Sequence, residues 1–190
     1  ISSIVVSGTD LFAGTFNGVY FSENNGTSWS STSFPSINRS VDELVANGAN
    51  LFAGTLFAGI FLSTNNGTSW SKVSSGLTDT VVRSLAFSGT NLFAGTLSGS
   101  VFLSTNDGTS WSRVSSVLTN SDIRKLAISG PNLFAATLGG VFLSSDNGTS
   151  WRNVSSGLTN PDVTSLAFSG TDIFAGTFGG VFLSTNNGTS

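Results

Sequence analysis

Short apolar stretches recur along the whole chain, and clusters of Gly, Asn, Ser, Thr and Asp separate them. A clear example is the series Val81–Phe87, Leu92–Leu97, Val101–Ser104 and Trp111–Ser116. These stretches are rich in Val, Phe, Leu and Thr and are bounded by turn-forming residues, as is typical of β-strands. No stretch has the apolar period of about 3.6 residues, or the length of about ten residues, that a helix needs. The pattern therefore predicts an all-β protein of short antiparallel strands.

The set of four stretches repeats along the chain. Trp residues mark the period, because Trp29, Trp70, Trp111 and Trp151 are 41, 41 and 40 positions apart. One four-stranded sheet cannot bury both of its faces alone, whereas radial stacking of such sheets buries them. A repeat of this length predicts a β-propeller of four-stranded antiparallel blades. A linear β-solenoid is the alternative, although the rungs of solenoids are usually shorter and parallel.

Five copies of the repeat fill the 190 residues, and we expect them to form a single β-propeller domain. The expected blades cover residues 1–37, 38–78, 79–119, 120–159 and 160–190. The last copy ends at Ser190, one residue before the position at which the other copies have Trp, so we expect its blade to lack the outer strand. Five blades is a small number for such a repeat, and the sequence does not begin with Met. We therefore expect a fragment of a longer array or a self-associating assembly.

A recurring sequence motif, which we call the box, connects the third and fourth stretches of each repeat. In the second copy the box spans Ser63–Trp70. Because the box joins two strands, it has to reverse the chain. Gly67 tolerates a positive φ, and Asn side chains bond nearby backbone groups in turns. Trp70 has the largest apolar area of the box, so we expect it to pack beneath the turn or between blades. The box positions are Ser22, Asn24, Gly26 and Trp29; Ser63, Asn65, Gly67 and Trp70; Ser104, Asn106, Gly108 and Trp111; Ser144, Asp146, Gly148 and Trp151; and Ser184, Asn186 and Gly188.

The box pattern S-x-D-x-G-x-x-W resembles the Asp-box, or BNR repeat, of sialidase-like and sortilin-like propellers. Similar boxes occur in xyloglucan-degrading enzymes and photosystem II assembly factors. This chain departs from the pattern, because the Asp position holds Asn24, Asn65, Asn106 and Asn186, with Asp only at Asp146. The resemblance implies that the boxes lie at outer turns, away from the central pocket, and it implies nothing about catalysis. The residues around each box also look like repeats of uncharacterised secreted or surface proteins of bacteria.

Composition narrows the function further. Charged residues are only 9% of the chain and the net charge is −3, which argues against nucleic acid and against an anionic membrane surface. No apolar run approaches the roughly 20 residues that span a membrane. The chain has no Cys and no His, which removes disulfides, thiolate metal sites and the commonest general base. We expect no cofactor and no metal, and an extracellular, cell-surface or periplasmic location.

A few residues are candidates for binding. Asp42, Arg83 and Arg124 occupy one aligned position at the start of the expected innermost strand. A mixed ring of this kind could bind an anionic or sugar ligand at one mouth of the propeller, or its charges could simply pair with one another in solvent. Asp122 and Asp162 directly precede the same strands and are candidates for the same mouth. Phe57 lies in an expected turn there, where an exposed aromatic can stack on a sugar or a partner protein or pack within its own turn.

The residues that carry catalysis in related propellers are not recognisable. A sialidase uses a nucleophilic Tyr and an arginine triad, whereas Tyr20 is the only Tyr and occupies a repeat position that holds Phe elsewhere. A glycoside hydrolase needs two carboxylates about 5 to 9.5 Å apart in a cleft, and the candidates are Asp42 and Glu43. We expect no catalytic residue and no enzyme. The leading hypothesis is a non-catalytic structural or binding module. In one version of this hypothesis the module assembles with copies of itself, and the partner is otherwise a different protein or a glycan. The second hypothesis is a lectin-like propeller that binds carbohydrate, and the third is a fragment of a glycoside hydrolase.

Six N-x-S/T sequons are acceptors only in an organism that N-glycosylates proteins. They are Asn25, Asn38, Asn66, Asn147, Asn153 and Asn187. Four of them belong to the boxes, where an Asn-Gly turn needs no glycan to explain it.

Overall fold

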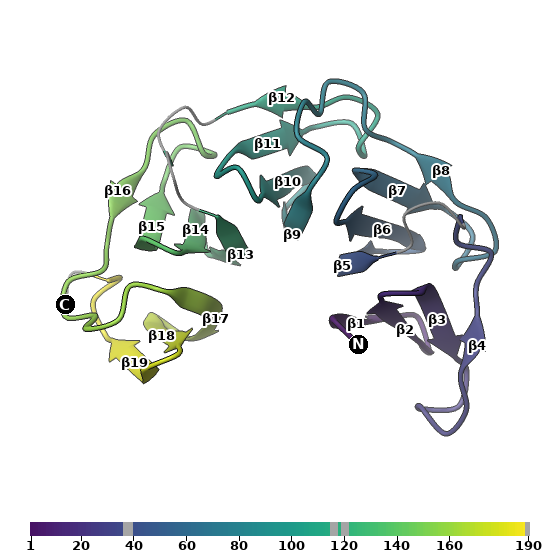
Figure 1. Ribbon diagram of the computed structural model, residues 1–190, viewed down its shortest axis with the longest axis horizontal. Coiled ribbons are helices and arrows are strands. Elements are labelled where there is room, and N and C mark those ends of the chain that lie inside the picture. The colour runs from purple at the N-terminus through teal and green to yellow at the C-terminus, as the bar shows by residue number, and fades with distance from the viewer. Residues whose placement is uncertain (36–39, 115–117, 119–121, 189–190) are drawn as a thin grey trace.

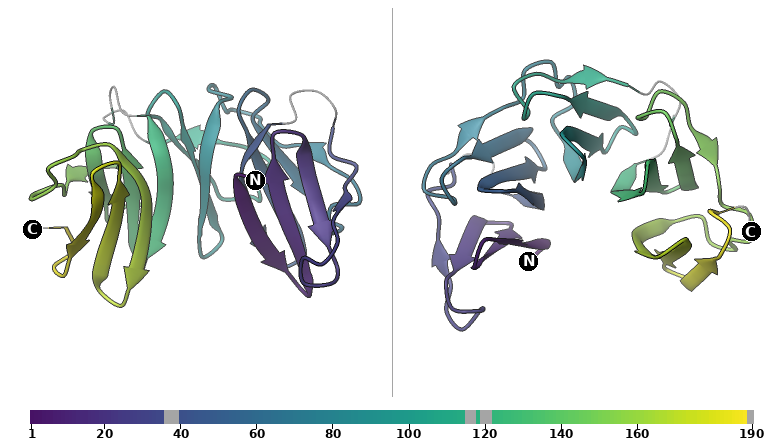
Figure 2. Two further views of the ribbon diagram at one scale, coloured as in Figure 1. Left: turned by 60° about the horizontal axis from the view of Figure 1, so that its bottom comes forward. Right: turned by 180° about the vertical axis from the view of Figure 1, so that it is seen from behind.

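Five antiparallel sheets stand around an open arc in the computed structural model, which describes residues 1–35, 40–114, 118 and 122–188 (Figure 1). The first strand of each sheet lies on the inner side of the arc, and the later strands follow outward. Two further views show the sheets standing side by side like blades (Figure 2). This is the radial arrangement of a β-propeller, as predicted, but the sheets do not close into a ring. The first and last sheets lie at the two ends of the arc.

Each sheet follows the order of its strands in the sequence, so a blade is one continuous segment of chain. The first blade contains β1 (Ser3–Ser7), β2 (Asp10–Thr15), β3 (Gly18–Ser22) and β4 (Ser30–Ser31). The second contains β5 (Val41–Asn47), β6 (Asn50–Thr55), β7 (Ile60–Ser63) and β8 (Ser71–Lys72). The third contains β9 (Val82–Ser88), β10 (Asn91–Thr96), β11 (Val101–Ser104) and β12 (Ser112–Arg113). The fourth contains β13 (Ile123–Ser129), β14 (Asn132–Thr137), β15 (Gly140–Ser144) and β16 (Arg152–Asn153).

The fifth blade has three strands within the described residues: β17 (Val163–Ser169), β18 (Asp172–Thr177) and β19 (Gly180–Ser184). The prediction of a last blade with only three strands is therefore confirmed. The outer strands of the other blades are shorter than predicted. We expected a strand over Trp111–Ser116, whereas β12 covers only Ser112–Arg113. Two pairs with β11 suffice to continue the sheet, and beyond Val114 the chain is outside the described residues until Leu118.

The hydrophobic core lies between successive blades. Phe52 and Ile60 of the second blade, for example, share a buried cluster with Val82 and Leu85 of the third. The second and third blades approach each other closely at Gly54, where a Cβ would lie 2.8 Å from Val82 Cγ1. A side chain at this position would therefore push the two blades apart. Each interface thus combines a β-branched or leucine side chain of one blade with a small residue of the blade before it.

Candidate functional site

A β-bulge near the start of the inner strand positions the predicted binding residues. In β9, Val82 pairs with Thr96 and Ser84 pairs with Gly95, so Arg83 is the extra residue of the bulge. The same shift makes Asp42 the extra residue in β5 and Arg124 the extra residue in β13. A bulge re-aims the side chain that it carries. The aligned position found in the sequence is therefore a structural device repeated from blade to blade.

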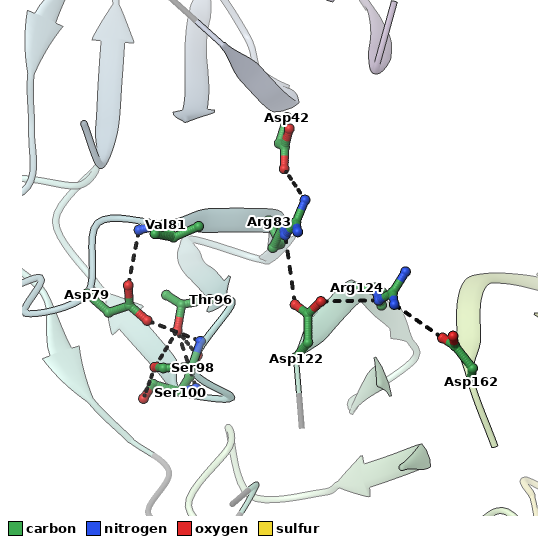
Figure 3. Close-up of polar contacts among 10 residues, drawn as sticks. All are labelled: Asp42, Asp79, Val81, Arg83, Thr96, Ser98, Ser100, Asp122, Arg124 and Asp162. Carbon is green, nitrogen blue, oxygen red and sulfur yellow. Dashed lines mark hydrogen bonds and ion pairs between the residues drawn. The ribbon is translucent and has the colours of Figure 1, made fainter. Parts of the chain in front are cut away.

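The three bulge residues join two further carboxylates in one ladder of alternating charge (Figure 3). Asp42 Oδ2 lies 3.1 Å from Arg83 Nη1, and Arg83 Nε lies 3.8 Å from Asp122 Oδ1. Asp122 Oδ2 lies 3.2 Å from Arg124 Nε, and Arg124 Nη2 lies 3.5 Å from Asp162 Oδ1. The ladder therefore links the second blade to the fifth through the inner ends of their strands.

Each charge of this ladder has an oppositely charged neighbour, but the pairing does not fully compensate the burial of the carboxylates. Burial raises the pKa of Asp42 and of Asp122, and the neighbouring guanidinium groups only partly oppose this effect. Arg83 lies between the carboxylates of Asp42 and Asp122, and Arg124 lies between those of Asp122 and Asp162. Three carboxylates against two guanidinium groups leave a formal excess of negative charge. An anionic ligand would have to displace a carboxylate from one of the arginines, so the ladder is poorly suited to anions.

A second row of polar contacts runs beside the ladder. Lys125 Nζ donates to Glu43 Oε2 across two blade interfaces. Ser84 Oγ also donates to Glu43 Oε2, at 3.4 Å, and accepts the backbone N–H of Leu126 at 3.0 Å. Burial raises the pKa of Glu43, and Lys125 opposes that shift. These contacts connect the second, third and fourth blades, so this second row stabilises the packing of the blades.

The sequence did not single out Asp79, which orders the turn between β10 and β11 (Figure 3). Its Oδ1 accepts the backbone N–H of Val81 at 3.1 Å, and its Oδ2 accepts that of Ser98 at 3.3 Å. Burial opposes ionisation of Asp79, but hydrogen bonds from Ser98, Thr96 and Val81 outweigh it and lower the pKa below its usual value. The signal available in the sequence was the Asp or Asn at this position in successive copies. Asn160 likewise accepts the N–H of Asp162.

A row of exposed apolar side chains lies at the turns between the second and third strands of the blades. Two backbone hydrogen bonds place these turns beside the start of the inner strand. The N–H of Leu56 donates to Ser40 O, and the N–H of Leu97 donates to Val81 O. Phe57 is 63% exposed. The other members are Phe16, Leu97, Leu138 and Phe178. The sequence drew attention to Phe57 alone, although a Leu or Phe directly follows the second strand in every copy. In the second copy that residue is the half-buried Leu56, and the exposed Phe57 comes next to it. An exposed apolar row of this kind is a candidate contact surface.

The boxes form self-contained turns between the third and fourth strands. Ser63 Oγ donates to Asn65 Oδ1 and accepts the N–H of Gly67, and Asn65 Oδ1 accepts the N–H of Ser69. Asn66 and Gly67 have the positive φ values, 50° and 78°. The same Ser-to-Asn or Ser-to-Asp bond recurs in the other copies. In the fourth copy, hydrogen bonds from Ser150 lower the pKa of the exposed Asp146 to about 2.

The box tryptophans attach each blade to the blade before it. Trp111 is 5% exposed, and its Nε1 donates to Val73 O of the second blade at 2.8 Å. Trp70 packs edge-on against Phe34 of the first blade, with ring centroids 5.1 Å apart. Trp29, in the first blade, is 37% exposed. The Trp of a box is therefore a contact between blades in the interior of the arc.

Both ends of the arc present the apolar faces that interior blades bury against one another. Ile4 on β1 is 56% exposed, whereas Leu44, at the same position of the second blade, is 3% exposed. Val181 on β19 is 74% exposed, whereas Val141, its counterpart in the fourth blade, is 3% exposed. We call the first surface the leading face (Ile1, Ile4 and Val6) and the second the trailing face (Val181 and Leu183). These two faces are the two halves of a blade–blade interface.

The remaining predictions concern glycosylation, metals and membranes. The sequon residues Asn25, Asn66, Asn147, Asn153 and Asn187 are exposed, and Asn38 lies outside the described residues. Within the described ranges, no group of three or more acidic, Cys or His side chains could hold a metal ion. No helix among the same residues is long and apolar enough to cross a membrane.

Comparisons with known proteins show the fold. No family model and no curated protein matches the chain. Among solved structures it is similar to an ancestral GH74 enzyme, with 25% identity over 92% of this chain and 27% of that chain and a TM-score of 0.77. It is similar to the extracellular domain of BT4673 from B. thetaiotaomicron, with 18% identity over 95% of this chain and 26% of that chain and a TM-score of 0.81.

A third similar structure is YCF48 bound to a D1 peptide, with 18% identity, a TM-score of 0.75 and coverage of 100% of this chain and 64% of that chain. The chain therefore spans about a quarter of the first two proteins and under two thirds of the third. These neighbours are β-propeller proteins with repeated four-stranded antiparallel sheets.

Proposed function

We propose that this chain is a non-catalytic, extracellular structural or binding module of Asp-box-type repeats, which associates head to tail with a second copy of itself. The observation that carries the proposal is the exposure of the leading and trailing faces at opposite ends of the arc. Four interfaces inside the chain show how such faces pack. A contact between two different faces is heterologous, so it can extend an assembly beyond two copies.

The energetics favour this association. Burying one Val, Leu or Ile side chain contributes about 1.5–3 kcal/mol, and each contact between copies would bury the apolar side chains of both faces. Gly176 occupies the position that Gly54 holds in the second blade, where the small residue admits a Val of the next blade. In a docked copy, Ile1 would occupy the position of that Val. The trailing face therefore has the shape that the leading face needs.

The polar features support a non-catalytic role. The carboxylates of Asp42, Asp122, Asp162 and Glu43 are all in ion pairs with cationic side chains that hold the blades together. The similarity to the ancestral GH74 enzyme covers 27% of that chain. The similarity to extracellular domains supports an extracellular location for this module.

Two single variants test the head-to-tail contact by complementation. Ile4→Asp removes only the leading face, and Val181→Asp removes only the trailing face. We expect wild type to show concentration-dependent oligomers in sedimentation velocity, and each variant alone to be monomeric. A mixture of the two should form dimers and nothing larger, because only one productive contact remains. The control Phe57→Asp, on the exposed row of turns, should behave like wild type. A monomeric wild type at high concentration, or a mixture that stays monomeric, would refute the proposal.

A lectin-like propeller is the second candidate, and the exposed aromatic side chains of Phe16, Phe57 and Phe178 favour it. Aromatic faces at a rim can stack on sugar rings. A glycan array decides this point: binding that Phe57→Ala weakens would support the lectin function, and no binding by wild type would exclude it.

A further inference from the structure

A groove lies between the outer part of the first blade and the box of the second blade. Its volume is about 400 Å³, within the range of about 300–1,000 Å³ that is typical of ligand sites. The residues that line the groove include Asp10, Phe21, Glu23 and Thr32 of the first blade and Asn66 and Thr68 of the second. Ser33 Oγ donates to Thr68 O, and both residues line the groove, so it lies at a place where the two blades are joined.

The first blade departs from the other copies at positions that line this groove. Phe21 occupies a register position at which every later blade has Leu. Glu23 stands where the other copies have Thr or Ser, and Thr32 stands where the second, third and fourth copies have Val. Asp10 replaces the Asn of the second, third and fourth copies, and the fifth copy also has Asp, at Asp172. Four departures from the repeat therefore meet at one groove, and they add an aromatic ring, a hydroxyl and two carboxylates to it.

The charges of the groove differ from those of the ladder. Each carboxylate of the ladder lies beside a guanidinium group, whereas among the described residues no Lys or Arg lines the groove. Asp10 is half-buried, and its Oδ1 accepts the hydroxyl of Thr9 at 3.3 Å. Glu23 is exposed to solvent. The described lining of the groove thus carries two formal negative charges and no positive charge, which favours a cationic ligand.

The hydrogen-bonding groups of the first blade point to the same kind of ligand. Thr32 Oγ1 donates to Val19 O, and Ser33 Oγ donates to Thr68 O. Because the protons of these two hydroxyls are already used, their oxygens can only accept further hydrogen bonds, as ionised carboxylates also do. A ligand of this side of the groove must therefore supply donors, and ammonium and guanidinium groups carry donors only. The ring of Phe21 adds an aromatic surface, to which an organic cation is attracted.

We propose that this groove binds an organic cation, a primary ammonium or a guanidinium group, with Asp10 and Glu23 as its anionic partners and Phe21 as its aromatic contact. Charge-assisted hydrogen bonds to the carboxylates give such a contact its strength. The same chemistry is present in a free polyamine and in a Lys or Arg side chain of a polypeptide, and the experiment below separates these two sources. The groove uses neither the leading face nor the trailing face, so the inference goes beyond the head-to-tail association and does not depend on it.

NMR titrations of the isotope-labelled Val181→Asp chain, which should not self-associate, test the inference. The probes are N-acetyl-arginine amide, spermidine and, as the neutral control, N-acetyl-citrulline amide, which has nearly the shape of the arginine derivative but no charge. We expect saturable shifts of the backbone amide signals of Asn66, Gly67 and Thr68 with a cationic probe. The citrulline derivative should bind roughly tenfold more weakly than the arginine derivative, or less tightly still, because its hydrogen bonds lack the charge. Binding of spermidine alone would assign the groove to free polyamines, and binding of the arginine derivative alone would assign it to a side chain of a polypeptide; either result supports the inference.

Chain variants localise the site. The double variant Asp10→Asn with Glu23→Thr introduces residues that other copies already have at these positions, so it should fold, and we expect it to weaken binding of the cationic probe by roughly tenfold or more. The control Asp172→Asn removes a carboxylate from the same repeat position of the fifth blade and should leave binding unchanged. The inference would be overturned by the absence of saturable binding or by equal effects of the double variant and the control. Equal affinities for the arginine and citrulline derivatives would also overturn it, even if the double variant failed to fold.

Discussion

Replacement of Trp111 by Ala is the sharpest test of how the blades are held together. Trp111 is 5% exposed and bonds Val73 O of the preceding blade, whereas Trp29 is 37% exposed in the first blade. Truncating a fully buried Trp to Ala costs about 3–5 kcal/mol, because apolar contacts are lost and a cavity remains. We expect Trp111→Ala to lower the free energy of unfolding by about that amount, and Trp29→Ala to lower it by less than half as much.

Urea unfolding followed by far-UV circular dichroism measures the difference, because most of that signal comes from the backbone and not from the indole that is removed. A loss of about 3–5 kcal/mol corresponds to roughly 6–20 °C in Tm for a chain of this size. The slope of the unfolding curve must also be compared, since a weakened interface in a repeat protein can uncouple the blades on its two sides. Equal losses for Trp29→Ala and Trp111→Ala would refute the reasoning, because a box Trp would then stabilise only its own turn.

Two further predictions concern close packing and pH. Gly54→Ala should lower the free energy of unfolding by about 1–3 kcal/mol, because its Cβ would lie 2.8 Å from Val82 Cγ1; in a double-mutant cycle Val82→Ala should recover part of that loss, and simple additivity would contradict the steric explanation. Burial raises the pKa of Glu43 above its usual value of 4.5, so the folded state holds this proton more tightly than the unfolded state. Its contribution to stability therefore falls as pH rises from about 4.5 through the raised value. Chemical unfolding between pH 4 and 7 should show a gain on acidification that Glu43→Gln reduces, and identical pH profiles for wild type and variant would contradict the assignment.

The repeat made the architecture readable from the sequence. Short β-type stretches in groups of four, with a Trp at a nearly constant spacing, can bury their apolar faces only by stacking like sheets. The three-stranded last blade followed from the same alignment, as did the turn at Asn66 and Gly67, which needs residues that tolerate positive φ. These features are local or depend on contacts between neighbouring copies. They could be predicted because each copy of the repeat has the same types of residue at the same positions.

Features that depend on particular pairs of blades needed the tertiary structure. The alignment placed Asp42, Arg83 and Arg124 in one row, but it did not show the bulges that aim their side chains. The ion pairs from Arg83 to Asp122 and from Arg124 to Asp162 also depend on how neighbouring blades are placed. The Lys125–Glu43 contact crosses two interfaces, which no local pattern encodes.

The ends of the arc were likewise decided only in three dimensions. Ile4 and Leu44 have the same sequence pattern, and so do Val181 and Val141, yet one member of each pair is exposed and the other is buried. The sequence by itself determined what each blade is: its strands, its turns and its Trp contact. The tertiary structure decided which of those faces are in contact with a neighbour, because burial depends on the position of a blade in the arc and equivalent residues differ only in that position.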